Sequence, residues 1–114
     1  GDSIIILANG ALRSLAGLAG VRGSLPGSLT IKDNAKLSAL DGLGGVESVG
    51  KDNRGRSLVI SANGALQSLA GLAGVRGSLP GSVAIAGNAK LLTIDGLGGV
   101  ESVGRDMQGR SIFI

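Results

Sequence analysis

Residues 28–43 read S-L-T-I-K-D-N-A-K-L-S-A-L-D-G-L, and two different periods of aliphatic residues follow each other in them. The first aliphatic residues, Leu29 and Ile31, are separated by one polar residue, which is the period-two pattern of a short strand with alternate side chains facing inward. Asn34 follows, and after it aliphatic residues recur at every third position. A helix needs mixed spacings of three and four, so this pattern predicts short extended segments that turn repeatedly around a narrow axis.

The same pattern returns along the whole chain of 114 residues. Residues 9–60 align with residues 63–114 at a spacing of 54, and 52 positions minus 13 differences leave 39 identities. Each 54-residue unit divides into coils of 25 and 29 residues. We therefore predict an all-β protein, a parallel β-solenoid (β-helix) of about four coils in one segment. The coils comprise residues 3–27, 28–56, 57–81 and 82–110, and residues 111–114 begin a fifth.

The two ends of the pattern lead to a further expectation. Ile4 and Ile6 begin in the middle of a strand pattern, and Ile112 and Ile114 stop in the middle of one, with no polar cap beside them. Solenoids need such caps because open ends expose strand edges and core. We expect uncapped ends, in a slice of a longer array or in a unit that stacks end to end.

Composition narrows the range of functions. The chain has 22 Gly but 43% hydrophobic residues, which argues against disorder, and it has one Phe and no Cys, His, Trp or Tyr. Thiolate and imidazole metal sites and Ser-His-Asp triads are therefore excluded, and we expect no enzyme, no cofactor and no metal. The net charge of +3 comes from dispersed cations, which does not favour nucleic acid, and no apolar run reaches the ~18 residues of a membrane span.

The pattern L-x-I-x-x-N-x-x-L-x-x-L-x-x-L in residues 29–43, and its match in residues 83–97, resembles the receptor L domain. Ordinary leucine-rich repeats are the nearest alternative, but they place a Leu two residues after the Asn, whereas Leu37 is three after Asn34. The resemblance implies a right-handed β-helix and an extracellular or cell-surface location. It also implies that the sheet face docks a partner. The central candidates on that face are Thr30, Val59, Ala84 and Phe113, beside a regular Ser column at residues 3, 28, 57 and 82.

Two columns of polar residues have structural interpretations. The first is an internal ladder that pairs backbone groups at the corners. Its members are Asn9, Asn34, Asn63 and Asn88. The second is a solvated ladder of alternating charge, which favours register but leaves no split pair of carboxylates for acid and base catalysis. Its members are Arg22, Glu47, Arg76 and Glu101.

Two insertions make the long coils long, and we expect them to bulge from one edge as basic loops. They are residues 51–56 and 105–110. The residues that would touch a polyanion or an acidic glycan are Arg54, Arg56, Arg105 and Arg110. The alternative interpretation is that both are surface loops without a binding role.

These patterns favour a non-enzymatic structural or interaction module, part of a rod whose partner is itself, another protein or a glycan. The alternative is a monomeric module that binds carbohydrate or an ice surface. An ice-binding face would want repeated Thr-x-Thr, and only Thr30 fits.

Overall fold

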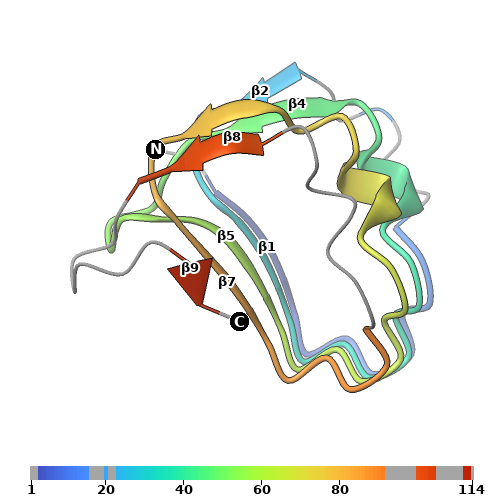
Figure 1. Cartoon of the computed structure of the whole chain (residues 1–114). Coiled ribbons are helices and arrows are strands. Elements are labelled where there is room, and N and C mark those ends of the chain that lie inside the picture. Colours follow the sequence, from blue (N-terminus) through green and yellow to red (C-terminus); the bar gives the residue numbers. More distant parts are fainter. Residues whose placement is uncertain (1–2, 16–19, 21–22, 92–99, 105–111, 114) are drawn as a thin grey trace.

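The computed structural model describes residues 3–15, 20, 23–91, 100–104 and 112–113 (Figure 1). This part of the chain forms an all-β solenoid of parallel, stacked coils, about three turns in extent. One five-stranded parallel sheet runs along one side of the stack. Its strands, in spatial order, are β1 (Ile4–Leu7), β3 (Leu29–Lys32), β5 (Arg56–Ser61), β7 (Ser82–Ala86) and β9 (Ile112–Phe113).

Within the described ranges, the coils also contain two shorter parallel sheets and two single turns of 3-10 helix. The short sheets pair β2 (Gly23–Leu25) with β4 (Val46–Val49), and β6 (Gly77–Leu79) with β8 (Val100–Val103). The helical turns are η2 (Asp41–Leu43) and η3 (Ala70–Leu72), which contact each other in successive coils. The predicted parallel β-solenoid is therefore confirmed.

The inward columns predicted from the sequence form the core. Leu29 pairs in register with Leu58, and Leu58 with Val83, so one column of aliphatic side chains crosses the large sheet. Leu29 is fully buried, whereas Ile4, its partner in β1, is only partly buried. A coil therefore buries its apolar side chains only where another coil covers it on each side.

The segments after each Asn are not simply extended, as the sequence had suggested. The N–H of Leu37 donates to the carbonyl oxygen of Asn34 at 3.1 Å, and the N–H of Leu43 donates to that of Leu40 at 3.1 Å. The equivalent bonds recur in the next coil. Hydrogen bonds between residues three apart are typical of 3-10 turns, which have three residues per turn. The period of three therefore reflects such turns, which bring the Leu at every third position back to the core.

The four Asn side chains form a hydrogen-bonded column. The Oδ1 atom of Asn63 accepts from the backbone N–H of Asn34 at 3.2 Å and from its Nδ2 at 3.1 Å. The Nδ2 of Asn63 donates to the carbonyl oxygen of Ile31 at 3.0 Å, one coil away. The same pattern links Asn9 to Asn34 and Asn63 to Asn88. Each amide thus joins two neighbouring coils through side chain and backbone at once.

The backbone turns through the left-handed region at the residue directly before each Asn. The values are 56° for Ala8, 59° for Asp33, 55° for Ala62 and 68° for Gly87. This conformation costs a residue with a Cβ roughly 1–2 kcal/mol relative to glycine.

Replacing Asn63 by Leu is expected to lower the free energy of unfolding by about 3 kcal/mol or more. The change removes the acceptor of the Asn34 backbone N–H and the donor to Ile31, and each buried unpaired group costs about 1–3 kcal/mol. The matched control is Asn9→Leu, because Asn9 is exposed and its backbone N–H can still reach Asn34. Denaturant unfolding measures both. Equal losses for the two variants would contradict the ladder as a buried constraint.

The corner conformation gives a second stability prediction. Ala62→Gly is expected to raise the free energy of unfolding by about 0.5–1 kcal/mol, because the relief of a positive φ exceeds the added chain entropy. Gly87→Ala should lower it by about 1 kcal/mol at the equivalent corner. Thermal melts of both variants test this, and effects of the same sign in the two would contradict it.

Candidate functional site

The residues proposed for the docking face lie in one row across the large sheet. Thr30 pairs in register with Val59, Val59 with Ala84, and Ala84 with Phe113. Thr30 and Ala84 are partly buried, and Val59 is only 7% exposed. The side chain of Phe113 lies outside the described part of the structure. The row is real, but Val59 offers almost no surface to a partner, so the row does not form an open docking patch at its centre.

The Ser column is not a surface feature either. Ser28 is 1% exposed and Ser57 is 0% exposed, although both were placed on the outward face. The hydroxyl of Ser28 donates to the Oγ of Ser3 at 3.1 Å, and the N–H of Gly81 donates to the Oγ of Ser57 at 2.7 Å. The hydroxyls of Ser28 and Ser57 therefore pair with neighbouring coils at a tight corner and have a structural role.

Two members of the charge ladder, Glu47 and Arg76, have side chains in the described part of the structure. The N–H of Arg76 donates to the carbonyl oxygen of Glu47 at 3.0 Å, so the two residues lie in adjacent layers. Their side chains are both exposed and make no ion pair with each other. Water solvates such charges well, and an exposed pair gains only about 0–1 kcal/mol. Arg22 and the side chain of Glu101 lie outside the described residues.

The first basic loop is organised by a carboxylate that the sequence interpretation overlooked. Within residues 51–56, Asp52 Oδ1 accepts from the N–H of Arg54 and from the N–H of Arg56, both at 2.9 Å. Asp52 Oδ2 accepts from the Nε of Arg56 at 3.0 Å. The N–H of Asp52 donates to the carbonyl oxygen of Arg56 at 2.9 Å, and Gly55 takes a φ of 79° to close the turn. The loop is therefore a closed, ordered turn.

Opposing effects set the pKa of the Asp52 carboxyl. Burial raises the pKa. The hydrogen bonds from the N–H groups of Arg56 and Arg54, together with the hydrogen bond and the charge of the Arg56 guanidinium, lower the pKa by more than burial raises it. The net result is a pKa below the ordinary value for aspartate. Asp52 is thus held as an anion at neutral pH.

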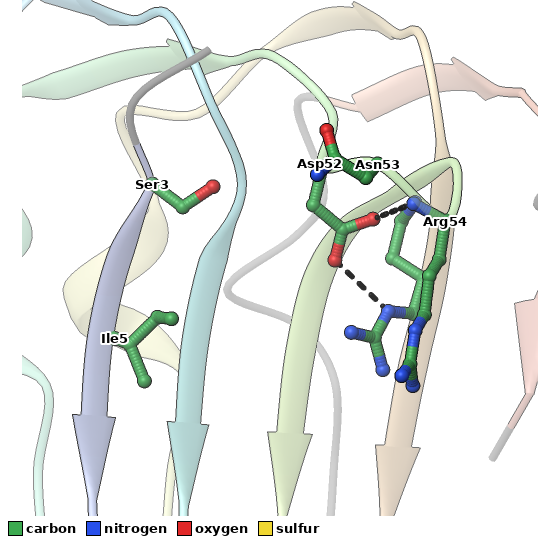
Figure 2. A pocket seen from close by; sticks show the side chains of 6 residues that line it. Ser3, Ile5, Asp52, Asn53 and Arg54 are labelled. Carbon is green, nitrogen blue, oxygen red and sulfur yellow. Dashed lines mark hydrogen bonds and ion pairs between the residues drawn. The ribbon is translucent and has the colours of Figure 1, made fainter.

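A shallow groove lies between this loop and strand β1. It has a volume of about 400 Å³, and its lining residues are Ser3, Ile5, Asp52, Asn53, Arg54 and Arg56. Figure 2 shows Ile5 on β1, and Ser3 just before this strand, facing the loop across the neighbouring strand. Ile5 is 63% exposed, Arg54 is exposed and Arg56 is partly buried. The groove therefore combines one apolar wall with a cationic one.

Among the predicted loop residues, the structure places Arg54 and Arg56 together at this groove, while Arg105 and Arg110 lie outside the described residues. The missed members are Ser3, Ile5, Asp52 and Asn53. A signal for the turn does exist in the sequence: both insertions carry D-x-x-G-R, at residues 52–56 and again at 106–110. No sequence signal showed that the first turn would face β1, because the two segments are separated by a whole coil.

Comparisons of the chain with protein-family models, with curated proteins and with solved structures gave no match. In the described ranges, no helix is long and apolar enough to cross a membrane. The same part of the chain holds no group of three or more acidic side chains that could bind a metal ion. The fold therefore defines the protein as a β-solenoid.

The first loop should loosen in acid. Because the folded pKa of Asp52 lies below its unfolded value of about 3.9, the stabilisation is complete well above that pH. It decreases as pH falls through the folded pKa. We expect the amide chemical shifts of Arg54 and Arg56 to titrate together with a midpoint below 3.9. Asp52→Asn should abolish this transition, and a midpoint above the ordinary value would contradict the assignment.

Proposed function

We propose that the chain is a non-enzymatic structural and interaction module that forms a segment of a stacked rod. The observation that supports this best is the incomplete burial of the first coil. Ile6 is partly buried and Asn9 exposed, whereas Ile31 and Asn34 hold the same places one coil further and are both 0% exposed. A further coil on the outer side of β1 would bury this layer as the others are buried.

The open side also carries hydrogen-bonding groups suited to another coil. In each inner layer, the Asn Oδ1 accepts two hydrogen bonds from the preceding coil. No described residue donates to the Oδ1 of Asn9, and β1 has a strand partner on one edge only, in the part of the chain described. The chemistry presented there matches a coil of the same kind, from a longer array or from a second copy.

The receptor L domain resemblance supports an interaction role at a cell surface or outside the cell. The support is the L-x-I-x-x-N-x-x-L pattern of residues 29–37, whose Leu, Ile and Asn are buried in the solenoid core. The right-handed coil and the partner-binding sheet are parts of the same proposal. The low exposure of Val59 favours the loop side of the sheet over the centre of its face.

Stacking is tested by the size of the isolated chain. Light scattering over a range of concentrations should show growth beyond the monomer, and electron micrographs should show rods. Asn9→Lys is expected to suppress growth at least tenfold, because it would bury an unpaired ammonium in the stack while leaving the monomer folded.

The matched control is Ala35→Lys, which adds the same charge at an exposed corner of an inner coil. This variant should grow like the unmodified chain. Discrete monomers at every concentration, or equal suppression by both substitutions, would overturn the stacked rod and favour a monomeric module.

A further inference from the structure

We propose that the groove between residues 51–56 and strand β1 binds an acidic polysaccharide through its carboxylate or sulfate groups. The site is complete within one chain, so it does not depend on stacking. Ile5 is exposed on β1, and Figure 2 shows it across the neighbouring strand from the loop. A coil added along the stacking axis would leave this face open.

The electrostatics of the groove select an anion. The loop carries three cations, Lys51, Arg54 and Arg56, against one carboxylate, Asp52, a local balance of three minus one, or +2. Asp52 is engaged with Arg56 at 3.0 Å. No described carboxylate pairs with the guanidinium of Arg54, which remains exposed at the groove. Guanidinium groups bind carboxylate and sulfate oxygens in a two-pronged, charge-assisted geometry.

The groove is ordered before a ligand arrives. Five hydrogen bonds close the loop around Asp52, and the carbonyl oxygen of Gly55 also accepts from the N–H of Ser82 in the next coil at 2.9 Å. Binding therefore need not order the loop backbone, which removes a large part of the usual entropic cost.

The wall opposite the loop, formed by Ser3 and Ile5, suits an anionic sugar better than other classes of anionic ligand. Ser3 Oγ accepts from the N–H of Ser28 at 3.0 Å and from its hydroxyl, so its own O–H can donate to a ligand. Ile5 offers an exposed aliphatic surface beside it. A uronic acid or sulfated sugar has C–H groups on one ring face and hydroxyls and an anion at its edge. Nucleic acid would want an aromatic platform, and the groove lining contains none.

The chain itself supplies the test substitution. Position 108 is equivalent to position 54 by the 54-residue repeat, and it carries Gln in the otherwise similar D-x-x-G-R turn. Arg54→Gln is therefore compatible with this loop, while it removes the unpaired guanidinium. Titration calorimetry with trigalacturonate and with a sulfated trisaccharide would measure binding. We expect at least one to bind, and Arg54→Gln to weaken it roughly tenfold or more.

The controls separate a site from general attraction. Arg76→Gln removes an exposed cation outside the groove and should change the affinity less than twofold. The methyl ester of trigalacturonate lacks the charge, and oligoglutamate lacks the sugar, so both should bind at least tenfold more weakly. The proposal is overturned if neither anionic sugar binds, if Arg54→Gln and Arg76→Gln act alike, or if oligoglutamate binds as well as the sugars. A chain that stays monomeric yet binds would overturn only the stacked rod.

Discussion

The buried column of hydrogen-bonded Asn side chains holds successive coils in register. An amide at the inner corner must find partners, because an unpaired polar group in the core costs about 1–3 kcal/mol. Asn63 finds them only in the coils on either side, at Asn34, Ile31 and Asn88. A slip of one residue would break all of these bonds and also turn the aliphatic columns outward. Coils of two different lengths, 25 and 29 residues, therefore still have to meet in the same register.

Much of the fold was predictable because its signals are local and repeated. The position of Asn34, the inward residues Leu29 and Ile31, and the spacing of three that follows are all visible in one coil. The 3-10 turns and the left-handed residue before each Asn were missed, because a period of three does not distinguish a 3-10 turn from an extended corner. The positive φ of Ala62, 55°, is imposed by the geometry of the corner and not by the conformational preference of alanine.

The candidate site was less predictable because it joins segments that are distant in sequence. The cations of the first loop were visible, but its order depends on Asp52, whose role appears only when its bonds to Arg54 and Arg56 are seen. Glu47 and Arg76 lie in adjacent layers without a direct ion pair, for a related reason. Proximity in adjacent layers brings their backbones together, but exposed side chains on flexible stems remain solvated unless something holds them.

Identical places in the repeat need not have identical surroundings. Ile5 and Val59 are 54 residues apart at the same place, yet one is 63% exposed and the other 7%. Inward positions are held alike because each layer is the template for the next, whereas Arg54 lies in a loop outside these columns. Differences between units can therefore accumulate in the loops without cost to the stack. A specific binding role in such a chain is best sought where the two units differ in sequence. One such difference is position 54, where Arg54 lines the groove while the equivalent position of the second unit, 108, carries Gln.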